Sequence, residues 1–264
     1  MQAHSLLSSG VIYKAMKNSI TELVDLINHS KRIVAFTGAG ISTQSGIPDF
    51  RGTDGIWSKY KPISFDEFVA SKSARVESWR RKAFLYEDLK RAKPNRGHVA
   101  VATLDKKGIL LAVITQNVDG LHQSSGIDDE KIIEIHGNAT RAACIDCKFS
   151  LPIEPILEKF KKKGLPPNCE KCGGLMKSAT ISFGQRMPEH AMKKSHEAAK
   201  TCDLFIVLGS SLVVYPAADL PLIAKKNNAT LVIVNRERTD HDRFADLVIN
   251  DEIGSVLGTV VGIP

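Results

Sequence analysis

Six apolar runs without regular alternation recur along the chain, at 33–36, 109–114, 132–135, 204–208, 231–234 and 247–249. Stretches with helical spacing or loop character separate most of them. Strands that are apolar without a break are buried on both faces, which is typical of a parallel sheet covered by helices. The pattern therefore predicts an α/β fold. Before the first run, Ser19 to Glu22 reads as a capping box that starts a helix.

Two segments interrupt this pattern and predict a second, smaller domain. Residues 142–177 hold four cysteines, the pair Pro166-Pro167 and the pair Gly173-Gly174, and we interpret the segment as an inserted zinc-ribbon module. Residues 52–96 are charged and predicted to be helical, and they form the other module of the small domain. The large domain then comprises 19–51, 97–141 and 178–260, and residues 1–18 form an N-terminal extension.

The cysteine spacing predicts a metal site. The pairs Cys144-x-x-Cys147 and Cys169-x-x-Cys172 are separated by 21 residues. Two such turns bring four thiolates together and complete a tetrahedral zinc site with no open position, so the zinc is expected to be structural. Disulfides or a redox pair are the alternatives. Cys202 opens an apolar run and is expected in the core.

Charge and hydropathy narrow the class of protein. The longest uncharged run, Leu204 to Ala218, has 15 residues, fewer than the roughly 20 of a membrane span. The N-terminus lacks the pattern of a secretory signal, and we expect a cytoplasmic protein. The net charge is +7, with basic clusters at 72–96 and 159–163. These clusters indicate either solvated helix faces or attraction to an anionic cofactor, a nucleic acid or an acidic partner.

A glycine-rich turn follows the first apolar run. Gly38 and Gly40 would let backbone amides approach a phosphate at a helix N-terminus, although a tight strand-to-helix turn explains them as well. The motif lacks the third glycine of the usual dinucleotide fingerprint. No acidic residue closes the second strand, but Asn235 and Arg236 follow a later strand and could serve a ribose or a phosphate.

Polar clusters also follow three other apolar runs: Gln116 to Gly120, His136 to Asn138, and Gly209 to Ser211. Ligands of open α/β sheets bind beyond the carboxyl ends of the strands, so these side chains are placed for chemistry, although some will cap helices. His98, His122 and His136 compete for the role of general base. The position at a strand end favours His136.

These motifs, together with Gly46 to Arg51, occur in the order seen in sirtuins, which are NAD-dependent protein deacylases. From residue 19 to 260 the chain resembles that family. The resemblance implies a Rossmann-like sheet domain with a smaller zinc-ribbon and helical domain, NAD as the cofactor, one structural zinc ion, and an acyl-lysine protein or peptide as the partner in the cleft between the domains.

The resemblance also implies roles for individual residues. His136 would be the general base, while Asn117 and Asp119 would hold the nicotinamide ribose and carboxamide. Acyl-lysine would contact Thr180, Ile181, Phe183 and Gly184. The remaining residues implied to contact NAD are Gly38, Ala39, Gly40, Thr43, Ile47, Pro48, Asp49, Phe50, Arg51, Trp57, Gln116, Val118, Gly209, Ser210, Ser211, Asn235, Arg236 and Ile253. The implied products are deacylated lysine, nicotinamide and O-acyl-ADP-ribose.

Departures from the family concern the substrate. Thr180 and Gln185 replace the Val and Glu of the family's substrate-pairing stretch. Members that favour acidic acyl chains carry a Tyr-x-x-Arg motif, which is missing between Gly52 and Arg96, so an acetyl or another uncharged acyl group is expected. The alternatives are an ADP-ribosyltransferase that uses the same NAD site, a zinc-ribbon protein that binds nucleic acid, and an NAD-dependent dehydrogenase. Association with DNA or a chromatin protein is a further expectation from the basic clusters.

Overall fold

The computed structural model describes residues 18–49, 55, 57 and 60–263. Phe50, Arg51 and nearly all of the predicted N-terminal extension lie outside these ranges. The chain is already helical at residue 18 and remains so to residue 29. The predicted capping box is therefore wrong, because Ser19 lies within the helix and a helix-capping residue stands at its boundary.

A parallel sheet of six strands forms the larger part of the molecule, in the order β3-β2-β1-β7-β8-β9. Its strands are β1 (Ile33–Thr37), β2 (Leu110–Thr115), β3 (Ile132–Glu134), β7 (Leu204–Leu208), β8 (Thr230–Val234) and β9 (Leu247–Ile249). The chain builds outward from β1 to β3 and then returns to add β7 on the other side of β1. This reversal of strand order is the place where Rossmann-like sheets bind ligands.

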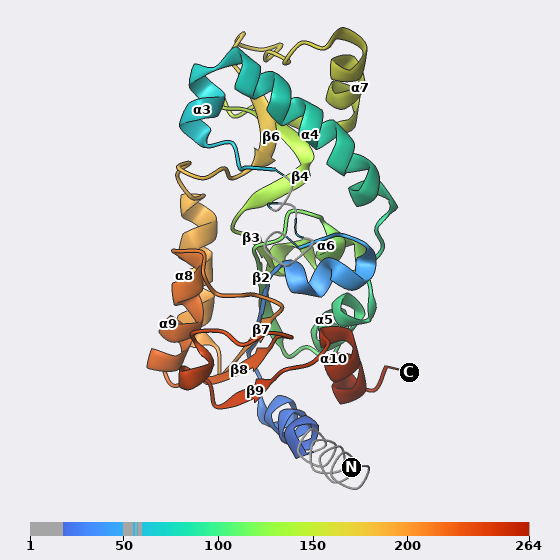
Figure 1. The fold of residues 1–264 in the computed structure, drawn as a ribbon. Coiled ribbons are helices and arrows are strands. Elements are labelled where there is room, and N and C mark those ends of the chain that lie inside the picture. Colours follow the sequence, from blue (N-terminus) through green and yellow to red (C-terminus); the bar gives the residue numbers. More distant parts are fainter. Residues whose placement is uncertain (1–17, 50–54, 56, 58–59, 264) are drawn as a thin grey trace, which may run out of the picture.

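Helices cover both faces of this sheet, as the runs of apolar residues predict (Figure 1). Within β1, Ile33 and Ala35 face a core shared with α5 (Arg96–Lys106), α10 (Ile253–Val261) and the helix at 18–29. Val34 and Phe36 face the opposite core, formed with α8 (Glu189–Thr201) and α9 (Leu220–Lys226). Alternate residues of one strand thus fill two cores, and this burial explains why the run has no polar position.

A second, antiparallel sheet lies at one end of the large one, in the order β5-β4-β6 (Figure 1). Its elements, with the helices that accompany it, are β4 (Gly137–Cys144), β5 (Ser150–Pro152), β6 (Met176–Thr180), α3 (Phe65–Ala70), α4 (Lys72–Arg91) and α7 (Glu154–Lys163). A third core, around Trp79, Phe160 and Met176, joins the helices to the sheet. Since β4 begins before residue 142 and β6 ends after 177, the strands extend past the predicted limits of the zinc module. The domain boundaries stay a prediction.

Short elements complete the described chain. They are α6 (Leu121–Ser124) and the 3-10 helices η1 (Ala39–Ser45), η2 (Asp129–Lys131), η3 (Ala217–Asp219) and η4 (Asp242–Phe244). Among the described residues, no helix is both long and apolar enough to cross a lipid bilayer.

Candidate active site

Two glycine turns meet where the strand order reverses. Gly38 and Gly40 follow β1, and Gly209 follows β7. A Cβ atom on Gly38 would lie 2.6 Å from the carbonyl oxygen of Gly209, and one on Gly40 would lie 2.7 Å from the Gly209 Cα. Real side-chain atoms do not approach so closely, so the turns depend on glycine to stay in contact. Their backbones form the floor of a cavity.

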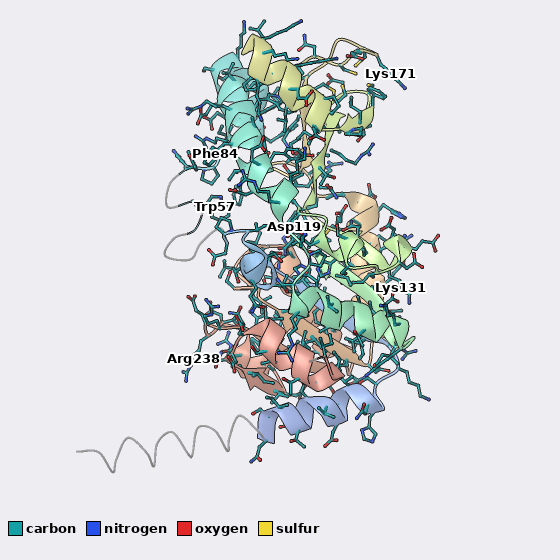
Figure 2. The ribbon with its side chains drawn as sticks, turned by 90° about the vertical axis from the view of Figure 1, so that its right-hand side faces the viewer. Trp57, Phe84, Asp119, Lys131, Lys171 and Arg238 are labelled. Carbon is teal, nitrogen blue, oxygen red and sulfur yellow. The ribbon has the colours of Figure 1, made fainter. Side chains whose placement is uncertain are left out.

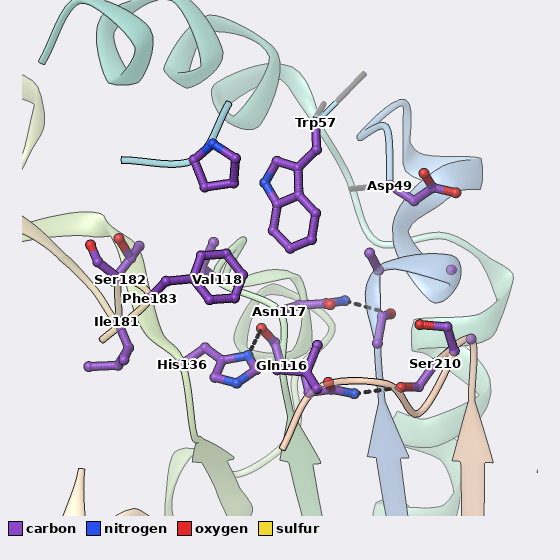
Figure 3. Close-up of a pocket in the computed structure, with 18 of the residues that line it drawn as sticks. Asp49, Trp57, Gln116, Asn117, Val118, His136, Ile181, Ser182, Phe183 and Ser210 are labelled. Atoms are coloured by element: carbon purple, nitrogen blue, oxygen red, sulfur yellow. Dashed lines mark hydrogen bonds between the residues drawn. The ribbon is translucent and has the colours of Figure 1, made fainter. Parts of the chain in front are cut away.

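The cavity has a volume of about 580 Å³ and lies between the large sheet and the small one (Figure 3). The predicted residues that line it are Gly38, Ala39, Gly40, Thr43, Asp49, Trp57, Gln116, Asn117, Val118, His136, Thr180, Ile181, Phe183, Gly184, Gly209, Ser210, Ser211, Asn235, Arg236 and Ile253. Among the described residues, Ile47, Pro48 and Asp119 were also predicted to contact NAD and do not line it. Residues far apart in the chain thus converge on one space.

Asn117 is held at the cavity wall by a buried hydrogen-bond network. Its side-chain amide donates to the carbonyl oxygen of Gly38 at 3.0 Å and to Ser42 Oγ at 3.1 Å. The Ser42 hydroxyl in turn donates to Asp119 Oδ2 at 2.7 Å. Asp119 lies at the level where the two sheets meet (Figure 2) and accepts the backbone N–H of Leu121. Asp119 therefore orients Ser42, and through it Asn117, although it does not itself line the cavity. Its predicted contact with the ribose stays a prediction.

His136 stands between the last residues of β3 and the first of β4. Its Nδ1 atom lies 3.0 Å from the carbonyl oxygen of Gln116 (Figure 3). A carbonyl oxygen only accepts, so Nδ1 carries the proton and Nε2 is the basic nitrogen of the neutral ring. The side chain of Gln116 donates to Ser210 Oγ at 2.8 Å. This chain of contacts ties the imidazole to the turn after β7.

The other two candidate bases lie behind the cavity rather than in it. His98 and His122 are buried, with ring centroids 5.0 Å apart, and neither is among the described residues that line the cavity. His122 Nε2 lies 2.9 Å from Thr37 Oγ1. Burial lowers the pKa of His122 to about 3 and that of His98 to about 4. Both rings are therefore neutral near pH 7 and support the loops from inside the fold.

Four thiols converge beside the end of β4, whose last residue is Cys144. The Sγ atoms of Cys144, Cys147, Cys169 and Cys172 all lie within 4.8 Å of one another. The Cys144–Cys172 pair is separated by 3.5 Å and the Cys147–Cys169 pair by 3.7 Å. A tetrahedral zinc ion with Zn–S bonds of about 2.3 Å needs sulfur atoms roughly 3.8 Å apart. The set fits one structural zinc ion, and its four members are not among the described residues that line the cavity.

The model of the Sir2 family matches residues 38–216, which span both glycine turns, His136 and the four cysteines. The chain belongs to the Sir2 family. An NAD-dependent protein deacetylase of Rhodopseudomonas palustris is 50% identical over 252 residues, covering 96% of this chain and all of that protein. An NAD-dependent protein deacylase 2 of Archaeoglobus fulgidus is 42% identical, over 93% of this chain and 96% of that protein.

Solved structures of Sir2 proteins share the fold. One bound to a propionylated peptide is 38% identical with a TM-score of 0.83, covering 93% of this chain and 99% of that one. Another, with a p53 peptide and NAD+, is 39% identical with a TM-score of 0.81, covering 91% and 96%. The Rossmann-like fold predicted from the family resemblance is confirmed.

One set of residues that lines the cavity of this Sir2 protein was not predicted from the sequence. Helix α4 contributes Ser78, Arg81, Lys82 and Leu85, and β6 contributes Lys177 and Ser178. The spacing of the four α4 residues puts them on one helix face, which is a signal that the sequence does contain. Nothing in the sequence indicates that this face meets β6 across a cavity.

Proposed function

We propose that this Sir2 protein removes acetyl, or another uncharged acyl group, from lysine side chains of proteins. NAD and one water molecule would be consumed, and nicotinamide and O-acyl-ADP-ribose released. One observation carries the proposal: a single cavity joins glycine turns suited to phosphates with an imidazole whose Nδ1 is anchored to the Gln116 carbonyl at 3.0 Å. The named activities of the relatives support the same reaction class.

The residues at the glycine turns fit a dinucleotide. The backbones of Gly38, Gly40 and Gly209 line the cavity without side chains of their own, so a pyrophosphate can approach their amides closely. Gln116 and Asn117 supply amides for a ribose, and Asn235 and Arg236 lie on the wall of the same cavity. When bound, NAD supplies a sugar carbon that becomes electrophilic as nicotinamide leaves.

The substrate peptide would extend the small sheet. The segment after β6 is joined to the site by the hydrogen bond from the backbone N–H of Ile181 to the carbonyl oxygen of His136, at 2.8 Å. An extended peptide that pairs with this segment binds through main-chain groups, which tolerate the substitutions at Thr180 and Gln185. Phe183 and Trp57, with ring centroids 5.3 Å apart, offer apolar contact to the aliphatic part of an acyl-lysine.

His136 would act as the general base. With Nδ1 donating to Gln116, Nε2 is the nitrogen that would take a proton from a ribose hydroxyl, and the resulting oxygen would receive the acyl group. The ring needs no rotation to do so, because the hydrogen bond holds its orientation. Trp57 and Phe183 cover this region and help to exclude water.

The test is to mix the purified protein with NAD and an acetyl-lysine peptide, and to follow nicotinamide and peptide mass. Nicotinamide release that depends on the peptide, with loss of the acetyl mass, is the expected result. A gain of mass on protein or peptide would indicate the ADP-ribosyltransferase instead. Absorbance of NADH would indicate a dehydrogenase, and no consumption of NAD would favour the nucleic-acid-binding alternative.

Two predictions concern the protein's surroundings. Association with DNA or a chromatin protein draws support from the basic α7, although Lys159 pairs with Glu170 and Lys161 with Glu87. Salt-dependent binding to a DNA duplex would test it. The cytoplasmic location is a prediction from sequence, and fractionation of the cells that produce the protein would test it.

A further inference from the structure

The connection that carries His136 is closed by a hydrogen bond between the side chains on either side of it. Glu134 is the last residue of β3, and Asn138 is the second residue of β4. The side-chain amide of Asn138 donates to Glu134 Oε1 at 2.7 Å. Within the part of the chain that the structure describes, neither residue lines the cavity. The contact therefore closes a short loop from outside the cavity, with the imidazole at the centre of that loop.

The same carboxylate also contacts the segment that follows β2. Gln123 of α6 donates its side-chain amide to Glu134 Oε1 at 2.8 Å. Helix α6 begins directly after the segment that contains Asn117 and Asp119, and Asp119 accepts the backbone N–H of Leu121 in the first turn of the helix. One oxygen atom of Glu134 thus connects the strand end that carries the predicted base with the strand end that is predicted to hold the ribose.

Asn138 is oriented by a second set of contacts. Its Oδ1 atom accepts the backbone N–H of Thr140 at 2.7 Å and the Thr140 hydroxyl at 2.6 Å, which leaves the amide nitrogen for Glu134. The backbone N–H of Ala139 donates to the carbonyl oxygen of Val118 at 2.8 Å. Both backbone and side chains therefore fix the start of β4 to the segment after β2.

Charge pairing does not account for Glu134. Among the residues that the structure describes, none forms an ion pair with this half-buried carboxylate, and both of its hydrogen-bond donors are uncharged amides. Burial raises the pKa of Glu134, and the carboxylates of Asp119 and Asp129 add to this rise, while the amides of Gln123 and Asn138 act against it. The carboxylate is stabilised at this position by its two hydrogen bonds.

We propose that Glu134 is a positioning residue for the general base, and that its two hydrogen bonds set where the backbone of His136 lies relative to the ribose end of the cavity. The inference rests on the proposed function, because it concerns the step in which His136 takes a proton from a ribose hydroxyl. Glu134 takes no part in that proton transfer. The Gln116 carbonyl orients the ring, and Glu134 places the segment from which the ring projects.

The proposed reaction offers a way to separate this role from a general loss of structure. His136 acts only after nicotinamide has left, so the reversal of nicotinamide departure needs no base. Labelled nicotinamide that enters NAD in the presence of the acyl peptide measures this reversal. A displaced His136 should therefore slow product formation and spare the exchange, whereas a distorted cavity slows both.

The experiment measures product formation and nicotinamide exchange by the full chain with NAD and an acetyl-lysine peptide. In Glu134→Ala, kcat for product formation should fall at least about tenfold, while KM for NAD and the exchange rate change less than about twofold. Glu134→Gln keeps an Oε1 acceptor for both amides and should recover most of kcat. Glu130→Ala, exposed in η2, is the matched control and should change none of these quantities.

Two further measurements cover the case in which Glu134→Ala does not fold or NAD is not consumed. Gln123→Ala removes one donor and keeps the carboxylate, and it should lower kcat at least about threefold without lowering the exchange. In the protein without NAD, ¹⁵N spectra of the His136 ring report its tautomer. The proton should stay on Nδ1 in the unmodified protein and in Glu134→Gln, and distribute over both nitrogens in Glu134→Ala and in Gln123→Ala, because the contact with Gln116 loosens.

Four outcomes would overturn the inference. Equal loss of product formation and exchange in Glu134→Ala would show that the residue only supports the fold. Unchanged kcat, or an unchanged tautomer, would show that the connection holds His136 without it. A Glu134→Gln protein as slow as Glu134→Ala would show that the site needs the charge and not the acceptor. If the unmodified protein consumes no NAD with the peptide, the proposed function fails, and the ring spectra alone decide whether Glu134 positions His136.

Discussion

At the scale of single residues, His136 shows how a backbone carbonyl can set the chemistry of a side chain. The Gln116 carbonyl fixes the proton on Nδ1, and thereby leaves Nε2 as the base. The hydrogen bond also orients the ring toward the cavity that it lines. Both tautomer and orientation are thus decided by one residue on the neighbouring strand end.

Replacing His136 by Ala should lower the deacylation rate by about 10²- to 10⁴-fold, the usual contribution of a general base. NAD binding and the melting temperature should change little, because the ring is only partly buried. Steady-state kinetics, calorimetric NAD titration and thermal unfolding measure the three quantities. His190→Ala, on the exposed surface of α8, is the control. Full turnover in His136→Ala would refute its role as the base.

The buried histidines predict a loss of stability in acid. Burial holds the pKa values of His98 and His122 at about 4 and about 3, below the unfolded value near 6.5. The unfolded chain therefore binds more protons below pH 6.5, and the free energy of unfolding should fall by up to about 1.4 kcal/mol per pH unit and histidine between pH 6.5 and 4. Above about pH 7.5 both imidazoles are unprotonated in the folded and the unfolded chain, so these two groups contribute almost no slope.

Urea unfolding at pH 7.5, 6.5 and 5.5 measures this slope. His122→Asn should show a shallower slope than the unmodified protein, whereas the exposed His190→Asn should keep it. Both variants retain the four cysteines, so the comparison removes the contribution of the zinc site. Identical slopes in all three proteins would contradict the prediction.

At the scale of elements, the glycine turns after β1 and β7 are in contact only because neither carries a side chain. Gly38→Ala would bring a Cβ atom to within 2.6 Å of the Gly209 carbonyl oxygen and separate the turns. We expect the KM for NAD to rise at least about tenfold, the equivalent of 1.4 kcal/mol. The measurement is initial rate against NAD concentration.

The matched control is Gly108→Asn, in the turn after α5. Gly108 has a positive φ of 73°, which Asn tolerates better than most residues, and a Cβ atom there meets no atom within 4 Å. The KM for NAD should stay unchanged. Equal KM values in Gly38→Ala and the unmodified protein would show that the turns need not touch.

The elements differ in how well sequence predicts them. The six strands of the large sheet are apolar on both faces, and each was found as a run. In contrast, β4 and β6 are rich in Gly, Ala, Ser and Thr, and they form because they pair with each other. Such pairing leaves no local pattern, so the sequence located the cysteines but not the ends of the small sheet.

The same contrast holds in the site. Gln116, His136 and Ser210 follow apolar runs, so their meeting at one edge of the sheet could be predicted. Lys82 and Lys177 are 95 residues apart in number and approach only when α4 packs over the small sheet. Ser42 was likewise not assigned a role, because its partners Asn117 and Asp119 come from another strand end.

At the scale of the whole molecule, the protein has separate cores on the two sides of the cavity. Two of them cover the large sheet, and the third contains Trp79, Cys144 and Cys169 together. Metal binding and packing are therefore linked in the small sheet. Loss of zinc should disorder this third core and leave the other two folded.

Cys144→Ser should reduce bound zinc from one ion per chain to none, lower deacylation at least about tenfold and shift the emission of Trp79, now 1% exposed, to longer wavelength. A Trp57→Phe background isolates the signal, and metal analysis counts the zinc. Cys202→Ser, in a core of the large sheet, should retain the metal. A zinc-free Cys144→Ser protein with full activity would exclude the structural role.

The chain passes from the large sheet to the small one through His136 and Gly137, and the latter crosses so near the Ala179 carbonyl that a side chain would not fit. His136 therefore lies at the connection between the two sheets. Its ring is held by the Gln116 carbonyl after β2, and the small sheet begins at the next residue, Gly137. Grafting residues 137–184 from another member of the family would accordingly replace the predicted acyl-lysine contacts Thr180, Ile181, Phe183 and Gly184 and leave the glycine turns of the recipient in place. The acyl-lysine preference of such chimeras would follow the grafted segment.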